Sequence, residues 1–139
     1  MQTKQIAYLS IAFVAMFFGS VIYFTSRAPS LLMFHWAAWF GAGSIITTLR
    51  GHSKTIIGFS PNWLIFSAPF ALWVLSYLMC IKAVWLNSKR WERYFWFWSV
   101  PIGSLAIEFG QKTPYIPGTY DMVDVITIVV ATLIALIIQ

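Results

Sequence analysis

Hydrophobic residues along this chain gather into five long runs, which are separated by short stretches rich in polar residues, proline or glycine. Each run approaches or exceeds the about 20 residues that a helix needs to cross about 30 Å of hydrocarbon. The runs do not alternate between apolar and polar positions, as the strands of a membrane barrel do. The pattern therefore predicts five helices, roughly over Ile6–Thr25, Leu31–Leu49, Trp63–Leu86, Tyr94–Gln111 and Met122–Ile138.

Two of these runs differ from the others. The first is too long for the core of a signal peptide, which has about 7–15 apolar residues, so we expect it to remain as a helix. The fourth is short and contains Pro101 and Gly103. If the fourth run lies in the membrane surface, the chain has four spans rather than five.

The composition supports a membrane protein. Apolar residues make up 60% and charged residues 9% of the 139 positions, whereas soluble domains average about 45–50% and about 25%. Nine basic and four acidic residues are too few to cover a small soluble protein that also holds 8 Trp, 12 Phe and 6 Tyr. We therefore expect one integral membrane domain over residues 1–139, an all-α bundle of about five transmembrane helices.

The net charge of +5 and the few cysteines and histidines narrow the possible chemistry. Basic residues of a membrane protein lie in loops and contact anionic lipids, so we expect membrane lipids and no nucleic acid as partners. The single cysteine, Cys80, excludes an internal disulfide and a multi-cysteine metal site. His35 begins the second predicted helix and His52 follows its end, about 25 Å further along, so the two cannot ligate one haem within this chain. A haem or pigment held together with a partner chain stays open. We expect no cofactor and no metal.

Basic residues also predict the orientation in the membrane. The cluster at residues 89–93 predicts a cytoplasmic loop, which places the loop at 112–121 outside and the C-terminus inside. Five crossings would divide the basic residues into Lys4, Arg50, Lys54 and Lys112 on one side and Arg27, Lys82, Lys89, Arg90 and Arg93 on the other.

Small residues of the second predicted helix offer a surface for close helix contact. They lie near one stripe, and small residues spaced in this way let two membrane helices approach each other, including helices of two copies of one chain. These residues are Ala38, Gly41, Ala42 and Ser44.

Three of the four acidic residues fall within a short segment near the C-terminus. Glu108 and Gln111 share one face of the fourth predicted helix, and Asp121 and Asp124 repeat that spacing at the start of the fifth. Two prolines and a glycine stiffen the connecting loop and fix how the two helix ends face each other. The four residues predict a polar pocket at one membrane face, with Lys112 as a counter-charge. Two alternatives are a structural hydrogen-bonded clasp and, for Asp121, capping of the last helix.

The same residues resemble the signature of VanZ-like membrane proteins, a family named after a protein that gives resistance to the glycopeptide teicoplanin. The family pairs a Glu-x-x-Gln helix end with a Gly-Arg-x-x-Asp-x-x-Asp turn, which Glu108–Gln111 and Gly118–Asp124 match in part. The stretch from Asn62 to Ala71 is similar to the family's Asn-x-x-x-Phe-x-Pro-x-Gly helix, with one residue more between Phe66 and Pro69. The resemblance covers about residues 62–139 and implies a bacterial cytoplasmic membrane and a role in the cell envelope.

Four positions depart from the family pattern. Thr119 replaces the arginine, Ile128 the asparagine, and Ala131 and Ala71 two glycines. The acidic half of the motif is therefore kept, but its fixed cation is absent, which puts any activity that depends on the arginine in doubt.

The sequence supports three functional hypotheses. The first is a VanZ-like, non-catalytic envelope protein that binds a lipid headgroup or a partner loop. Its binding residues would be Glu108, Gln111, Asp121, Asp124, Asn62 and Lys112. The second is an accessory subunit of a larger membrane complex, and a homo-oligomer is a related possibility. The third is a small lipid-headgroup enzyme with Glu108 and Asp124 as a carboxylate pair, although no Ser-His-Asp set, His-Glu-x-x-His or phosphate-binding loop is present.

Overall fold

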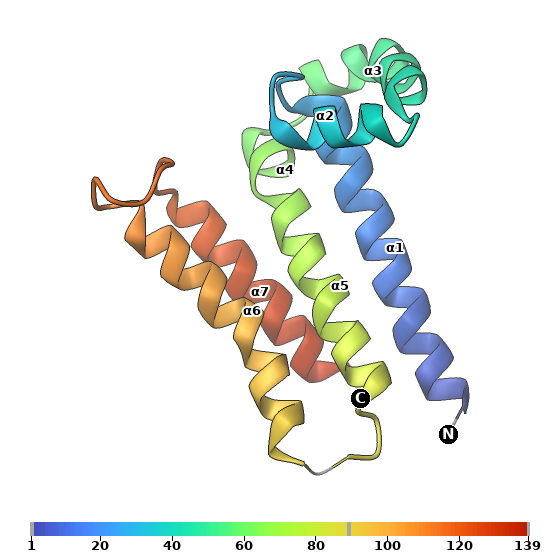
Figure 1. Cartoon of the computed structure of the whole chain (residues 1–139), viewed down its shortest axis with the longest axis vertical. Coiled ribbons are helices and arrows are strands. Elements are labelled where there is room, and N and C mark those ends of the chain that lie inside the picture. Colours follow the sequence, from blue (N-terminus) through green and yellow to red (C-terminus); the bar gives the residue numbers. More distant parts are fainter. Residues whose placement is uncertain (1, 89, 139) are drawn as a thin grey trace.

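The computed structural model describes residues 2–88 and 90–138, apart from the side chains of residues 54–56. The described part of the chain is all-helical, which confirms the predicted fold class (Figure 1). Its helices are α1 (Gln2–Ser26), α2 (Leu32–Trp39), α3 (Gly43–Gly58), α4 (Asn62–Phe66), α5 (Ala68–Val84), α6 (Trp91–Gly110) and α7 (Met122–Ile137).

The four long helices α1, α5, α6 and α7 form an antiparallel bundle in which the chain runs alternately up and down (Figure 1). The short helices α2, α3 and α4 cover one end of this bundle. Both chain termini lie at the opposite end, together with the connection between α5 and α6. The loop between α6 and α7 lies at the covered end.

Helix α5 is the centre of the bundle because it contacts α1, α6 and α7. Its side chains Leu78 and Met79 are fully buried. Around them packs a core of small and aromatic residues from all four helices, namely Tyr8, Ala12, Val74, Ala83, Phe97, Ala131 and Ala135. Two departures from the VanZ-like pattern fall in this region, since Ile128 and Ala131 are both buried in the interior.

The single helix predicted over Leu31–Leu49 is wrong. The chain breaks between α2 and α3, where Gly41 adopts a φ of +77°, a left-handed conformation that only glycine adopts without strain. Helix α3 then continues to Gly58, through residues that the apolar pattern assigned to a loop. The small residues from Ala38 to Ser44 consequently do not form one helical stripe.

The boundaries of the third and fourth predicted helices also shift. Ser67 separates α4 from α5, and Pro69 lies in the first turn of α5, where its missing N–H removes no helical hydrogen bond. Helix α6 begins at Trp91 and runs for 20 residues through Pro101, which is buried inside the bundle. The fourth run is therefore a full-length helix despite its proline.

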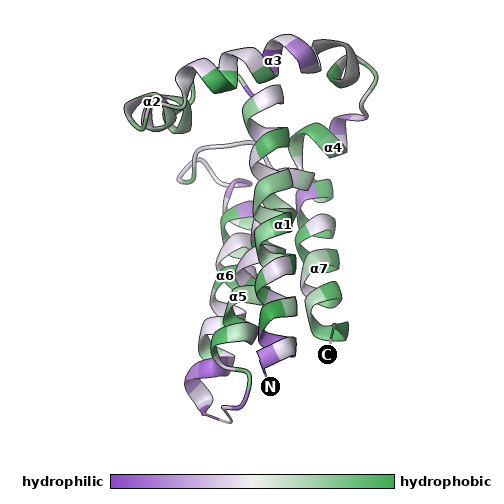
Figure 2. Ribbon diagram, turned by 90° about the vertical axis from the view of Figure 1, so that its right-hand side faces the viewer, coloured by the Kyte–Doolittle hydropathy of each residue, from purple (hydrophilic) through white to green (hydrophobic). Residues whose placement is uncertain are grey.

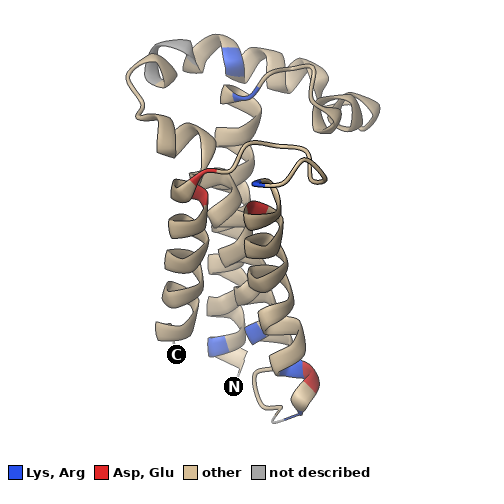
Figure 3. Cartoon of the chain, turned by 90° about the vertical axis from the view of Figure 1, so that its left-hand side faces the viewer, with Lys and Arg blue, Asp and Glu red and all other residues tan. Residues whose placement is uncertain are grey.

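Hydrophobic and charged residues are distributed unevenly along the long axis of the bundle. Hydrophobic residues cover the middle of the long helices (Figure 2), and the charged residues gather near the two ends (Figure 3). One described helix, α1, has both the length and the apolar composition to cross a membrane, and α5 and α7 are shorter apolar helices.

The position of the termini changes the predicted grouping of basic residues. Lys4 lies at the same end as Arg90 and Arg93, whereas Arg27 lies at the covered end with Arg50 (Figure 3). Five crossings would place the two termini at opposite ends of the bundle, whereas here they lie at the same end, because the segment Leu31–Leu49 does not run the length of the bundle.

Candidate functional site

The predicted acidic residues meet at the covered end of the bundle. Glu108 lies in the last turns of α6, where its side chain is only 6% exposed. Asp121 and Asp124 stand at the start of α7, and both interact electrostatically with Glu108. The stiff loop between the two helices returns the chain so that both helix ends face the same space.

Asp121 has a structural role that the sequence also suggested. Its Oδ1 accepts a hydrogen bond from the backbone N–H of Val123 at 2.9 Å, so the side chain caps α7. Such a cap satisfies one of the free N–H groups at a helix start. Asp124 lies in the first turn without forming this bond, and its Oδ1 is buried with no hydrogen-bond partner.

A cavity of about 650 Å³ lies between these helix ends and is called the polar cavity below. Its size is in the range of small-molecule sites, about 300–1,000 Å³. Its polar lining includes Arg27, Trp73 and the four predicted residues Glu108, Gln111, Asp121 and Asp124. Its apolar lining includes Tyr23, Phe66, Pro69, Phe70 and Ile107.

Arg27 is the cation that the sequence interpretation missed. It follows the end of α1, its Nη2 donates to the backbone carbonyl of Phe66 at 2.9 Å, and its guanidinium lies 4.9 Å from the centre of the Phe66 ring. These contacts hold Arg27 against the polar cavity. The sequence offered only a weak signal for it, an arginine directly after the first apolar run, because a separation of 81 residues does not show that Arg27 and Glu108 line one cavity.

Gln111 lines the polar cavity and depends on Gly118. Gly118 has a φ of +134°, and a Cβ built on it would lie 2.6 Å from the Gln111 side-chain carbon Cδ. Glycine at this position therefore serves two purposes: it permits the turn before α7 and it leaves room for the amide of Gln111.

Asn62 and Lys112 do not line the polar cavity. Asn62 is the exposed first residue of α4. Lys112 is exposed, and its Nζ lies 4.1 Å from the centre of the Tyr120 ring and 5.3 Å from that of Phe109. Lys112 thus lies over two aromatic rings outside the cavity lining, whereas Arg27 is the cation among the residues that line the cavity.

Four polar atoms of cavity-lining residues are buried without a hydrogen-bond partner: Arg27 Nε, Trp73 Nε1, Glu108 Oε2 and Asp124 Oδ1. Buried polar groups in proteins are almost always hydrogen-bonded, because an unpaired one costs about 1–3 kcal/mol. Four such atoms among the residues that line one cavity make this part of the protein the strongest candidate for binding a polar ligand.

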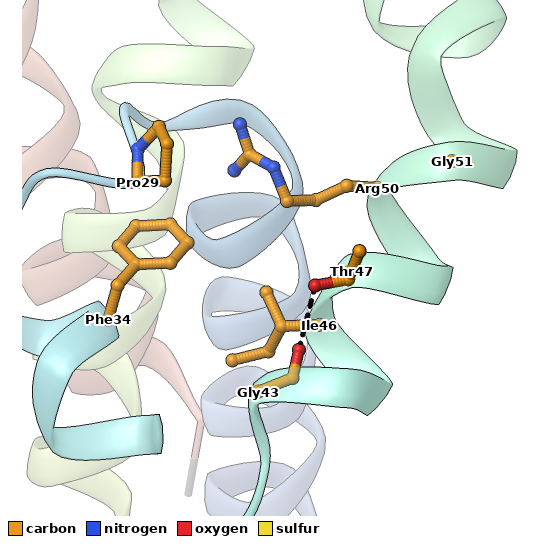
Figure 4. Close-up of a pocket in the computed structure, with 7 residues that line it drawn as sticks. All are labelled: Pro29, Phe34, Gly43, Ile46, Thr47, Arg50 and Gly51. Carbon is orange, nitrogen blue, oxygen red and sulfur yellow. Dashed lines mark hydrogen bonds between the residues drawn. The ribbon is translucent and has the colours of Figure 1, made fainter. Parts of the chain in front are cut away.

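A second cavity of about 490 Å³ lies between the α1–α2 connection and α3 (Figure 4). Its main polar side chain, Arg50, is already satisfied: Nη1 donates to the carbonyls of Phe24 and Arg27 at 2.8 Å, and the guanidinium lies 5.4 Å from the Phe34 ring centre. Thr47 donates to the carbonyl of Gly43. Arg50 thus caps the end of α1 and ties α3 to the bundle.

The described residues contain no group of three or more His, Cys, Asp or Glu side chains arranged to hold a metal ion. No protein-family model, curated protein or solved structure matches the chain.

Proposed function

We propose that the chain is a multi-pass membrane protein in which α1, α5, α6 and α7 cross the bilayer and the short helices lie at one membrane face. Helix α1 has 25 residues and α6 has 20, which correspond to about 37 Å and about 30 Å at 1.5 Å per residue. The hydrocarbon core is about 30 Å thick. The uncharged middle of the bundle and its charged ends support this placement (Figure 3).

Site-specific labelling tests the four crossings. Single cysteines are introduced at Thr3, Ser88 and Tyr115 in a Cys80→Ser background, and intact membrane vesicles are treated with a membrane-impermeant maleimide. Four crossings place Thr3 and Ser88 on one side and Tyr115 on the other. If Thr3 and Tyr115 label together and Ser88 does not, the five-crossing topology is correct. Labelling after detergent addition confirms that each cysteine is reactive.

In this proposal the polar cavity binds the headgroup of a membrane lipid and carries out no reaction. The support is that residues of α5, α6 and α7 and of the segment after α1 line one cavity, and that four of their buried side-chain atoms have no hydrogen-bond partner. An internal clasp would pair these atoms with one another. A lipid headgroup supplies both hydrogen-bond donors and acceptors at the depth where the helices end.

Membership of the VanZ-like proteins is part of the proposal. The support is that Glu108, Gln111, Asp121 and Asp124 share one cavity. Arg27 provides a cation where the family arginine is replaced by Thr119, so loss of that arginine need not remove the function. With this membership we also propose a role in the bacterial cell envelope, including glycopeptide resistance.

Glu108→Gln tests headgroup binding. The variant replaces the carboxyl group by an amide of the same shape, and Glu92→Gln on the same helix is the matched control outside the cavity. Native mass spectrometry after mild detergent purification is expected to find one bound lipid on the original protein and the control. Glu108→Gln should lose it, with an unchanged helical circular dichroism spectrum.

Two other results would overturn the headgroup proposal. If the protein purifies with a stoichiometric protein partner, and Glu108→Gln releases that partner, the chain is an accessory subunit of a larger complex. If Glu108→Gln changes neither lipid nor partner but lowers the thermal midpoint, the acidic residues form a structural clasp.

A further inference from the structure

The unpaired atoms of the polar cavity are divided by their hydrogen-bonding type. The two donors, Arg27 Nε and Trp73 Nε1, belong to the end of α1 and to α5. The two acceptors, Glu108 Oε2 and Asp124 Oδ1, belong to α6 and α7. The helices α1 and α5 lie on one side of the bundle and α6 and α7 on the other (Figure 1). The residues that line the cavity are thus divided into a donor wall, Arg27 and Trp73, and an acceptor wall, Glu108 and Asp124.

The donor wall suits a phosphate. A guanidinium binds phosphate oxygens through charge-assisted hydrogen bonds, and an indole N–H can only donate. The bond from Arg27 Nη2 to the Phe66 carbonyl fixes the guanidinium while its Nε remains unpaired. Trp73 is held against the ring of Tyr23, whose centre lies 5.2 Å away. Both donors are therefore positioned before any ligand arrives.

The acceptor wall suits a primary ammonium group. Glu108 is nine-tenths buried, and its free oxygen needs a hydrogen-bond donor. A primary ammonium has three N–H donors, whereas a trimethylammonium has none and would leave both carboxylate oxygens unpaired. An anionic headgroup without an amine would bring a further negative charge to a cavity that holds three carboxyls and one arginine.

We infer that the polar cavity is selective for a phosphoethanolamine group, with its phosphate at Arg27 and Trp73 and its ammonium at Glu108 and Asp124. This inference rests on the proposed headgroup binding. The ligand chemistry is that of phosphatidylethanolamine, and soluble phosphoethanolamine shares it. The aromatic side chains Tyr23, Phe66 and Phe70 also line the cavity and offer apolar surface to the glycerol end of a lipid.

The test uses the full chain in nanodiscs of equal parts phosphatidylethanolamine, phosphatidylglycerol and phosphatidylcholine, with the retained lipid identified by native mass spectrometry. We expect phosphatidylethanolamine to be enriched by about tenfold or more, which is the effect of one charge-assisted hydrogen bond. Glu108→Gln should abolish this enrichment, and Glu92→Gln should preserve it. Trp73→Phe keeps the ring and removes the N–H, and should reduce retention severalfold.

Four outcomes decide between the inference, the proposed function and the source of the ligand. Preferential retention of phosphatidylglycerol or phosphatidylcholine overturns the selectivity and leaves headgroup binding intact. Retention of no lipid by the original protein removes both. Displacement of the bound lipid by millimolar soluble phosphoethanolamine supports the inferred chemistry and identifies the headgroup alone as sufficient. Failure of displacement, with phosphatidylethanolamine still enriched, supports the lipid as the source.

Discussion

Replacing Gly19 by leucine is expected to destabilise the bundle by about 3 kcal/mol, at the upper end of the usual cost of overpacking. Gly19 is buried where α1 meets α5. A Cβ at this position would lie 2.9 Å from Trp73 Nε1 and 3.0 Å from the carbonyl oxygen of Pro69. The backbone of α5 cannot retreat as a side chain could, so the two helices must separate.

Gly103→Leu is the matched control for this prediction. A Cβ at Gly103 in α6 meets no atom within 4 Å, so leucine there finds open space and gains helix propensity, about 0.5–1 kcal/mol. Thermal unfolding in mild detergent should give a much lower midpoint for Gly19→Leu and an equal or higher one for Gly103→Leu. Equal losses in both variants would contradict close packing of α1 on α5.

Replacing Lys82 by methionine is expected to destabilise the protein by about 2–3 kcal/mol, because it leaves two carbonyl groups at the end of α7 without a donor. Lys82 is only 9% exposed. Its Nζ donates to the backbone carbonyls of Ala135 and Ile138 and lies 5.7 Å from the centre of the Tyr8 ring. The lysine thus joins α5 to α7 at the end where the chain termini lie.

Lys4→Met makes the same chemical change at the same end of the bundle on an exposed residue. It should leave the unfolding midpoint within about 0.5 kcal/mol of the original protein, as surface substitutions usually do. Hydrogen exchange of the last turn of α7 should accelerate in Lys82→Met alone. If the two variants unfold alike, the Lys82 contacts do not stabilise the bundle.

The helical class and the approximate position of four long helices could be predicted from the sequence, since long apolar runs without alternation leave few other structures. The same reasoning gave a wrong prediction for Leu31–Leu49, which is divided between α2 and α3. Hydropathy registers its apolar side chains but not the left-handed backbone at Gly41, which turns the chain before a long helix can form. Hydropathy also cannot distinguish residues that face lipid from those that cover the end of a bundle.

The candidate site, too, could be predicted only in part from the sequence. Helical spacing placed Glu108 with Gln111 and Asp121 with Asp124, and the proline-rich loop between the pairs brought them to one cavity. Lys112 was the natural counter-charge by proximity in sequence, yet it lies over the rings of Phe109 and Tyr120. The cavity's cation is Arg27, which the antiparallel packing of α1 brings to the acidic helix ends.

The sequence by itself determined the features that depend on neighbours along the chain: helix formation, the scarcity of charge and the acidic pairs that share a helical face. Only the tertiary structure decided which helices contact each other, that both termini lie at one end, and that donors from α1 and α5 face acceptors from α6 and α7. The physical reason is that periodicity records local geometry, whereas packing depends on the shapes of surfaces distant in sequence. Gly19 illustrates the difference, because a side chain is excluded at this position by the backbone of α5, which lies far from it in sequence.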